Sequence, residues 1–369
     1  MTTSLNDWYR GRRVYVTGHT GFKGSWLVAW LREAGAIVTG FALPPEADRP
    51  ALFRDAALHV GIDSQFGDIL DSSRLSASLA GAAPEIVFHL AAQSLVRRSY
   101  REPVQTMAAN VIGTAHLLEA VRAARSARAV IVVTSDKCYE NDGSGRPISE
   151  DAAMGGHDPY SASKGCAELV TAAWRRSFLA PAGVAVATAR AGNVFGGGDW
   201  GEDRLIPDLV TSVSQGELAV LRNPDAVRPW QYVLEPLHGY LLLGRALIER
   251  GEEVAEGWNF GPDAADALTV RDIARRFSDV WGRTLVSEAA VSGALHEAPT
   301  LRLDASKAVL RLGWKPILTL DQALATTAMW YRDAFDEPAA IAALVRRHLA
   351  DFTDRLPIIP PAAAGVRSN

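Results

Sequence analysis

Short apolar runs alternate with amphipathic stretches through the first half of the chain. The runs are rich in Val, Ile and Ala, which is typical of strands buried on both faces of a parallel sheet. The longer stretches repeat apolar residues at helical spacing, as Val111, Ala115, Leu118 and Val121 do. Strands are predicted at residues 13–17, 36–42, 85–89, 129–133 and 184–189, and helices at 22–32, 104–124 and 158–178.

This alternation of strand and helix predicts an α/β fold with a Rossmann-type, doubly wound parallel sheet. From about residue 190 the pattern breaks into shorter, mixed elements, and a glycine-rich loop lies at 196–200. We therefore expect a first domain over residues 1–190, with some later segments returning to it, and a smaller mixed α/β domain over 191–340. Residues 341–369, which end in a Pro- and Ala-rich stretch, are expected to form a partly flexible C-terminal extension.

A glycine loop separates the first strand from the first helix. It reads Thr-Gly-His-Thr-Gly-Phe-Lys-Gly over residues 17–24. Glycine allows a tight turn there and lets backbone N–H groups approach a pyrophosphate at the start of a helix. The strand–loop–helix setting predicts that the first domain binds a dinucleotide. The expected cofactor-binding residues of the loop are Gly18, His19, Gly21, Phe22, Lys23 and Gly24.

The end of the second predicted strand bears on which dinucleotide is bound. It reads Gly-Phe-Ala-Leu-Pro over residues 40–44, without an acidic residue to bind the hydroxyls of an adenosine ribose. His19 and Lys23 are expected instead to place positive charge near the adenosine phosphates. NAD is the expected cofactor, and NADP is left open. Asp68, followed by Ile69, is a candidate for contact with the adenine, with a surface turn as the alternative.

A tyrosine and a lysine lie four residues apart in the helix predicted at 158–178. Tyr160 and Lys164 would share one face of that helix, where the ammonium can favour the tyrosinate and also reach a cofactor ribose. Ser135, at the end of the neighbouring strand, can hydrogen-bond the phenolic oxygen. Such a set removes a proton from an alcohol while a nicotinamide accepts the hydride. Because only five of the 38 basic residues are lysine, a chance Tyr–Lys spacing is rarer here.

Composition narrows the classes of partner. The chain has 369 residues, 48% of them hydrophobic, and a net charge of −4, so a packed core is expected and binding to nucleic acid or an anionic membrane is not. No apolar run has the length of a membrane span, and no Cys/His spacing predicts a metal site. Two cysteines, Cys138 and Cys166, form no disulfide framework, which favours the cytoplasm.

Several longer stretches resemble the extended short-chain dehydrogenase/reductase family, over about residues 12–335. The stretches that resemble its nucleotide-sugar epimerase and dehydratase branch are residues 89–93, 158–164 and 190–196. Those that resemble the branch members acting on CDP-glucose are residues 18–26, 134–139, 197–207 and 228–231. The resemblance implies bound NAD, CDP-glucose as substrate, and loss of water to give a 4-keto-6-deoxy sugar for surface polysaccharide.

The resemblance also implies roles for individual residues. Leu90, Ala91 and Ala92 are implied on the cofactor side. A sugar nucleotide further requires cations and hydrogen-bond donors for its diphosphate. The candidate substrate-binding residues are Arg97, Asn193, Arg204, Leu205, Arg222, Arg228, Asn259 and His296. Ordinary surface charge is the alternative for the arginines, and a surface turn is the alternative for His296. Trp200 and Trp230 are candidates for stacking on a base or sugar, with core packing as the alternative.

Asp136 and Lys137 directly follow Ser135. The resemblance implies a glutamate base at the position of Lys137 in enzymes that act on dTDP-glucose, and lysine in those that act on CDP-glucose. We expect Asp136 to be the acid for the departing 6-hydroxyl and Lys137, in its neutral form, to be the base for the C5 proton. Pairing of Lys137 with Glu140 or Glu150 is the alternative.

Two other functions fit parts of this pattern. A nucleotide-sugar 4-epimerase would use the same cofactor and the same tyrosine and lysine, but it needs no acid or base at C5 and C6. A non-catalytic dinucleotide sensor would be expected to lack Tyr160 or Lys164, and both are present. The Asp136–Lys137 pair favours the dehydratase.

The helices predicted at 104–124 and 158–178 carry more apolar surface than one buried stripe requires. Ala167, Val170, Thr171 and Trp174 extend the apolar face of the second one. Such helices are expected to pair with their copies across a two-fold axis, which gives a homodimer or a dimer of dimers.

Overall fold

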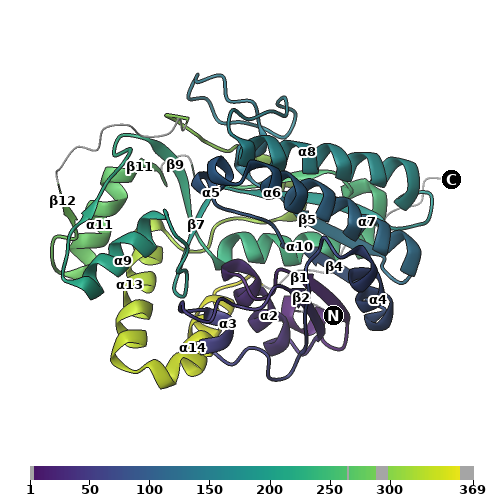
Figure 1. Ribbon diagram of the computed structural model, residues 1–369, viewed down its shortest axis with the longest axis horizontal. Helices are drawn as coiled ribbons and strands as arrows, with labels where there is room; N and C mark the ends of the chain where they lie inside the picture. Colours follow the sequence, from purple (N-terminus) through teal and green to yellow (C-terminus); the bar gives the residue numbers. More distant parts are fainter. Residues whose placement is uncertain (1–3, 264–265, 288–297, 358–369) are drawn as a thin grey trace.

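The computed structural model describes residues 4–263, 266–287 and 298–357 (Figure 1). Its centre is a seven-stranded sheet with the order β10-β6-β5-β4-β1-β2-β3, and each neighbouring pair of strands is parallel. The strands are β1 (Arg13–Thr17), β2 (Ile37–Ala42), β3 (Asp63–Phe66), β4 (Ile86–His89), β5 (Ala129–Val133), β6 (Ala185–Ala191) and β10 (Gly257–Phe260). The predicted Rossmann-type fold is confirmed.

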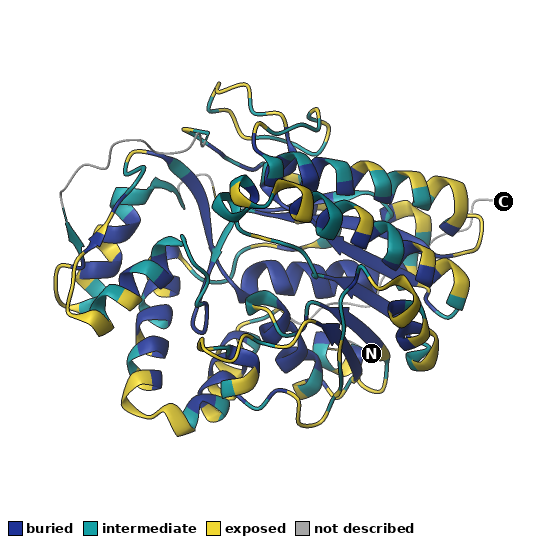
Figure 2. Cartoon of the chain, viewed as in Figure 1, coloured by how far each residue is buried: buried dark blue, intermediate teal, exposed yellow. Residues whose placement is uncertain are grey.

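Successive strand residues face opposite sides of the sheet and enter two different cores. Val14 and Val16 belong to one core, while Tyr15 between them belongs to the other. The helices packed in the first core include α2 (Phe22–Glu33) and α10 (Leu234–Arg250), and those in the second include α4 (Ser72–Ala82), α7 (Gly113–Ala124) and α8 (Pro159–Trp174). Burial on both faces explains why the strands read as continuous apolar runs (Figure 2).

Both long predicted helices contain a π-helical turn. The first consists of α6 (Pro103–Met107), the π-helical turn η1 (Ala108–Ile112) and α7, and the second of α8 and the π-helical turn η3 (Arg175–Leu179). Asn110, within η1, donates a hydrogen bond from Nδ2 to Oγ of Ser163, 2.8 Å away on α8. The turn therefore joins the first long helix to the helix that carries Tyr160 and Lys164.

The later part of the chain forms smaller, mixed elements, as predicted. A three-stranded sheet has the order β11-β9-β7, and a two-stranded sheet pairs β12 with β8. These strands are β7 (Asn193–Phe195), β8 (Ala219–Val220), β9 (Val227–Tyr232), β11 (Ala267–Thr269) and β12 (Val286–Ser287). The helices here are α9 (Leu205–Gln215), α11 (Val270–Trp281), α12 (Ser306–Leu312) and α13 (Leu320–Asp336).

Shorter helices complete the described chain. They are α1 (Leu5–Tyr9), α3 (Leu52–Asp55) and α5 (Val96–Arg101), with 3-10 turns at η2 (Asp136–Cys138), η4 (Gly251–Val254) and η6 (Pro338–Ala340). No helix in the described ranges combines the length and the apolarity needed to cross a membrane.

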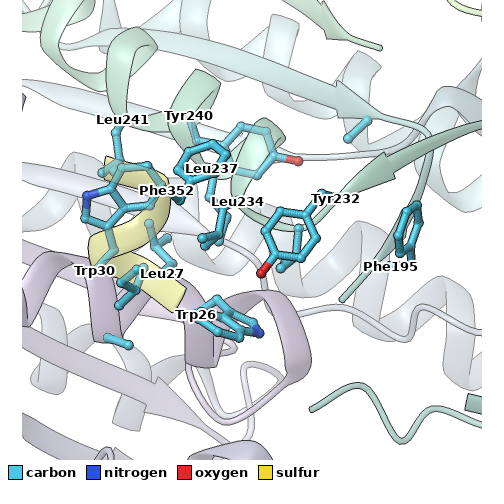
Figure 3. Close-up of a cluster of buried hydrophobic side chains, with 14 of the residues drawn as sticks. Trp26, Leu27, Trp30, Phe195, Tyr232, Leu234, Leu237, Tyr240, Leu241 and Phe352 are labelled. Atoms are coloured by element: carbon cyan, nitrogen blue, oxygen red, sulfur yellow. The ribbon is translucent and has the colours of Figure 1, made fainter. Parts of the chain in front are cut away.

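Segments far apart in sequence meet at the helix that follows the glycine loop. Figure 3 shows Trp26 and Trp30 of α2 among side chains of α10, β7 and β9, together with Phe352 of α14 (Ile341–Thr353). Nε1 of Trp26 also donates to the carbonyl oxygen of Gly197, 2.9 Å away. The segment predicted as a C-terminal extension thus begins with a packed helix, while residues 358–369 lie outside the described residues.

Candidate active site

A cavity of about 960 Å³ opens along the carboxyl ends of the central strands. It is lined by the glycine loop, by the residues that follow β4 and β5, and by loops of the later part of the chain. The chain leaves β1 into α2 on one face of the sheet and leaves β4 toward α7 on the other face. Such a switch point is where open α/β sheets bind their ligands.

The glycine loop is shaped for close backbone approach. Gly18 has φ +72°, and a Cβ there would lie 2.6 Å from the backbone nitrogen of Ala91. A Cβ at Gly24 would overlap the carbonyl oxygen of Gly18. Gly21 is the N-cap of α2 and provides no side-chain cap, so the first N–H groups of the helix stay available to a phosphate. The loop therefore fits a dinucleotide pyrophosphate.

Most of the predicted cofactor-side residues lie along this one cavity. Its lining includes Gly18, Gly21, Phe22, Lys23, Gly24, Asp68, Ile69, Leu90, Ala91 and Ala92. One carboxylate oxygen of Asp68, Oδ1, accepts a hydrogen bond from the backbone N–H of Leu70 at 2.9 Å. The other carboxylate oxygen is left for a ligand or for solvent.

The prediction that His19 carries positive charge is wrong. The imidazole is fully buried, and Nε2 is hydrogen-bonded to Oγ of Ser64 at 2.8 Å. Burial lowers the pKa of His19 to about 4, so the ring is neutral at physiological pH. A Cβ at Gly40 would overlap the ring, which shows that His19 fills the space above β2. Its role is to pack the loop against the sheet.

Lys23 lies among charged side chains at the end of the cavity that holds the candidate reacting groups. Enclosure in the protein lowers its pKa to about 7, and the neighbouring cations Lys164 and Arg204 act in the same direction. Asp136 and Asp199 oppose this shift. These neighbours place the Lys23 ammonium beside the candidate reacting groups, whereas the sequence suggested the adenosine phosphates.

Tyr160 and Lys164 project from the first turns of α8. The helix begins at Pro159, where Asp158 caps it by accepting from the N–H of Ser161 at 2.9 Å. Both side chains are buried and both line the cavity. Nζ of Lys164 donates to the carbonyl oxygen of Val133, 3.2 Å away at the end of β5. The predicted tyrosine–lysine face is therefore present beside the end of the neighbouring strand.

Burial dominates the ionisation of this pair. It raises the pKa of Tyr160 to about 12, and the interaction with the Ser135 side chain opposes the shift. It lowers the pKa of Lys164 to about 8, and the carboxylate of Glu168 opposes that shift. Ser135 and Arg204 are thus the groups that lower the pKa of the Tyr160 phenol, while Lys164 lies one turn further along the same face of α8.

Asp136 and Lys137 form the 3-10 turn η2 that follows β5. Oγ of Ser135 donates to Oδ1 of Asp136 at 2.9 Å and accepts from the backbone N–H of Lys137 at 3.2 Å. Oδ2 of Asp136 is buried and has no hydrogen-bond partner among the described residues. Burial raises the pKa of Asp136, although the Lys137 ammonium pulls it down. Burial thus makes this carboxyl easier to protonate than an exposed aspartate.

Lys137 lines the cavity and is half-buried. The alternative of an ion pair with Glu140 or Glu150 is not seen in the described part of the chain, where Glu150 accepts instead from the backbone N–H of Asn259 at 2.8 Å. Because no ion pair of Lys137 is seen among the described residues, its side chain can act on a ligand.

The substrate-side arginines are held by carboxylates that the sequence reasoning did not single out. Arg204 binds Asp199 at 2.9 Å, and Arg222 binds Asp203 at 2.6 Å and Asp208 at 3.0 Å. All of these side chains line the cavity, as do those of Arg97, Asn193, Leu205 and Arg228. Asp199, Asp203 and Asp208 lie within five residues of Arg204 in the sequence. This closeness could have indicated that acidic side chains orient the arginine.

Asn259 was wrongly predicted to contact substrate. It is fully buried in β10 and does not line the cavity. Its Oδ1 accepts from the hydroxyl of Tyr139 at 2.7 Å, and its Nδ2 donates to the carbonyl oxygens of Ile148 and Asp304, each 3.0 Å away. These bonds inside the protein engage both ends of the side-chain amide. The predicted residue His296 lies outside the described residues.

The two tryptophans line the cavity but are also engaged in packing. Trp200 stacks edge to face with Tyr331 at a ring separation of 5.3 Å. Trp230 is buried and donates from Nε1 to the carbonyl oxygen of Leu268 at 3.0 Å. No group of three His, Cys, Asp or Glu side chains in the described ranges is arranged to hold a metal.

Comparison with known proteins supports this geometry. The family model described as GDP-mannose 4,6 dehydratase matches residues 15–327. The chain is 48% identical to CDP-glucose 4,6-dehydratase of Salmonella typhimurium, over 88% of this chain and 92% of that one. These matches span both the glycine loop and the Tyr160–Lys164 helix.

Solved structures agree in fold. A dTDP-glucose 4,6-dehydratase from Streptomyces venezuelae, solved with NAD bound, matches with a TM-score of 0.74 and 27% identity, over 87% of this chain and 97% of that one. A UDP-glucose 4-epimerase from Thermotoga maritima matches with a TM-score of 0.77 and 24% identity, over 87% and 99%. The second match shows a shared fold alone.

Proposed function

The chain belongs to the family described as GDP-mannose 4,6 dehydratase, and from that premise we propose that it removes water from CDP-D-glucose to give CDP-4-dehydro-6-deoxy-D-glucose with NAD as its cofactor. The observation that carries this proposal is the convergence of Ser135, Asp136, Lys137, Tyr160 and Lys164 at one end of the cavity that starts at the glycine loop. The relative with 48% identity supports the choice of the cytidine nucleotide.

The glycine loop, Asp68–Ile69 and Leu90–Ala92 would hold NAD in the cavity, and Lys164, which lines the same cavity, would bind its nicotinamide ribose. When bound, NAD supplies the chemistry of a hydride acceptor for C4 of the sugar and a hydride donor for C6. The NAD-bound dehydratase with 27% identity supports this choice.

The protein's own groups move the protons. The Tyr160 oxygen accepts the proton of the sugar 4-hydroxyl, aided by the Ser135 side chain and by the Lys164 ammonium one turn further along α8. The resulting 4-ketone acidifies the hydrogen on C5. Lys137 takes that proton and Asp136 gives a proton to the departing 6-hydroxyl, so that water leaves and a C5–C6 double bond remains. Return of a proton to C5 and a hydride to C6 completes the deoxy sugar.

Cationic side chains in the later part of the chain would bind the diphosphate of the substrate. Arg204 and Arg222 line the cavity, with Arg97 and Arg228 alongside. Because Asp199, Asp203 and Asp208 already hold two of these guanidinium groups, the arginines are oriented before substrate binds.

The proposed reaction is tested by incubating the purified protein with CDP-, dTDP-, GDP- and UDP-glucose and recording product masses. We expect efficient loss of one water from the CDP compound alone. An isomer of unchanged mass would indicate a 4-epimerase, and preference for another nucleotide would overturn the proposed substrate. If no sugar nucleotide is turned over, the sensor function is favoured.

Replacing Gly24 with alanine is expected to weaken NAD retention by about 10- to 100-fold, because the new Cβ would overlap the Gly18 carbonyl and the loop would have to shift, which costs about 1–3 kcal/mol. The measurement is the NAD-to-protein ratio after purification. Gly81→Ala is the matched control, since a Cβ at Gly81 on α4 meets nothing within 4 Å. Full NAD occupancy in Gly24→Ala would contradict the assigned cradle.

We also propose that two copies pair through the helices α7 and α8. Large apolar side chains remain exposed along these helices and their π-helical turns, with Ile112 at 49%, Leu169 at 61% and Phe178 at 46% exposure. A homodimer, or a dimer of such dimers, would bury them. The product class suits deoxysugar and O-antigen synthesis in the cytoplasm, and both cysteines are free, in keeping with that compartment.

Leu169→Glu is expected to convert a dimer into a monomer at micromolar concentration, because a charge would be buried in the helix pair. The mass of the particle is measured by multi-angle light scattering. Leu310→Glu, at a residue with 82% exposure on α12, is the control and should keep the wild-type mass. A monomeric wild-type protein would contradict the proposed assembly.

A further inference from the structure

A buried carboxylate lies directly behind the reacting groups. Glu168 follows Lys164 by four residues on α8, so the two side chains share a face. Its Oε1 accepts from Oγ1 of Thr134 at 2.5 Å and from Nε of Arg190 at 2.8 Å. Its Oε2 accepts from Oγ1 of Thr188 at 2.7 Å and from Arg190 at 2.8 Å. Both oxygens are thus fully engaged in a site only 6% exposed.

The same cluster touches each element that carries a reacting group. Glu168 is on the helix of Tyr160 and Lys164, and Thr134 directly precedes Ser135 at the end of β5. Arg190, on β6, donates to the hydroxyl of Tyr139, 2.5 Å away at the end of the turn that carries Asp136 and Lys137. One carboxylate–guanidinium pair therefore links the helix, the strand end and the turn.

Stability alone is a weak reason for such a pair. Removing two charges from water costs several kcal/mol per ion, and apolar replacements of buried ion pairs are often neutral or stabilising. The position of the pair beside Lys164 suggests a more specific role. Glu168 is the leading group that opposes the loss of charge on the Lys164 ammonium.

Other charged and titratable groups also face Lys164. Cys138, on the turn η2, acts in the same direction as Glu168. Lys23 in the glycine loop and His89 at the end of β4 interact with Lys164 as well. His89 is neutral because burial lowers its pKa to about 3, and burial raises the pKa of the Cys138 thiol. Glu168, one helical turn from Lys164 on the same face of α8, is consequently the carboxylate with the largest effect on this lysine.

We propose that Glu168 is a positioning residue that keeps Lys164 in its ammonium form and fixes Tyr160, Ser135 and the Asp136–Lys137 turn in one arrangement. The proposal deepens the proposed function, on which its catalytic consequence rests. The ammonium favours the phenolate of Tyr160, so loss of the Glu168 charge would impair the first proton transfer.

The test is Glu168→Gln, compared with Thr188→Val. The first removes the charge, while the second removes one hydrogen bond to the same carboxylate and leaves the charge in place. Competitive labelling of Lys164 with acetic anhydride, read by peptide mass spectrometry against pH, measures the ionisation midpoint of the amine without substrate. Removing an anion lowers that midpoint, and we expect a shift of about one unit in Glu168→Gln. In Thr188→Val no shift is expected.

A pH profile of kcat/KM provides the second readout. Because the ammonium is lost at lower pH, the alkaline fall in activity should move toward acid in Glu168→Gln and stay in place in Thr188→Val. Glu168→Asp should restore the wild-type midpoint. If Glu168→Gln does not fold, the double variant Glu168→Gln/Arg190→Met removes both charges and leaves neither one unpaired, and a smaller labelling shift in the same direction is expected.

An unchanged labelling midpoint in a folded variant without the Glu168 charge would overturn the proposal. A shifted midpoint together with no turnover of any sugar nucleotide by the wild-type protein would support the role of Glu168 toward Lys164 and overturn the proposed function. The labelling result therefore separates the two failures.

Discussion

Lys137→Met is expected to abolish hydrogen exchange at C5 of the sugar while the first hydride transfer to NAD still occurs. The half-buried amine lines the cavity beside Asp136 and has no competing ion pair with Glu140 or Glu150 in the described chain. Loss of a positioned base costs on the order of 10²–10⁴ in rate. The measurements are deuterium incorporation at C5 from heavy water, absorbance of reduced NAD in single turnover, and overall product formation.

Lys137→Arg is the matched variant for that experiment. Arginine retains the positive charge but does not deprotonate in proteins, so it cannot act as the base. Both variants should therefore lose C5 exchange. If Lys137→Arg keeps it, charge rather than proton abstraction is the contribution of this residue. If Lys137→Met loses NAD reduction and keeps exchange at C5, Lys137 serves the first half-reaction and the assignment is wrong.

Tyr160→Phe is expected to block the reaction earlier, with loss of both NAD reduction and dehydration. The phenolic oxygen is the atom that accepts the 4-hydroxyl proton in the proposed reaction, and Tyr160 lines the cavity on the same helix as Lys164. A loss on the order of 10²–10⁴ in turnover is expected. Single-turnover absorbance of reduced NAD separates this variant from Lys137→Met, which should still show the signal.

Tyr240→Phe is the control for removing a buried phenol close to the site. Its hydroxyl has no hydrogen-bond partner among the described residues, so its removal leaves no group unpaired. Turnover within a few-fold of wild type is expected. Ser135→Ala is expected to have a smaller effect than Tyr160→Phe. Loss of the Ser135 hydroxyl raises the pKa of Tyr160 further, which moves the acidic limb of the activity profile toward higher pH. A Tyr160→Phe variant that still reduces NAD would contradict the assigned proton acceptor.

Strands and helices with strong local patterns could be predicted from sequence. β5 was predicted at residues 129–133 and has those bounds. Five consecutive apolar residues are typical of a strand that is buried on both faces of a sheet. β3 and α4 were not predicted. β3 reads Asp-Ser-Gln-Phe at the sheet edge, where one side of the strand is unpaired and polar residues are tolerated. The π-helical turns likewise have no pattern that distinguishes them from continuous helix.

The candidate site divides in the same way. Gly18, Tyr160 and Lys164 could be predicted because tight turns and helical spacing act within a few residues. His19 and Asn259 were assigned wrongly, since burial made the first neutral and packing engaged the second. Neither the burial of His19 nor the packing of Asn259 is determined by the residues next to it in the sequence.

By itself, the sequence determined the strand–loop–helix unit, the spacing of Tyr160 and Lys164, and the order Ser135, Asp136, Lys137 at a strand end. Tertiary structure decided which charges meet. Glu168, Arg190 and Thr134 come from different elements, as do Arg222 and Asp203, and no local spacing brings them together. Electrostatic interactions in a low-dielectric interior depend on distance through space and on burial, and both are set only when the sheet, its covering helices and the later segments have packed.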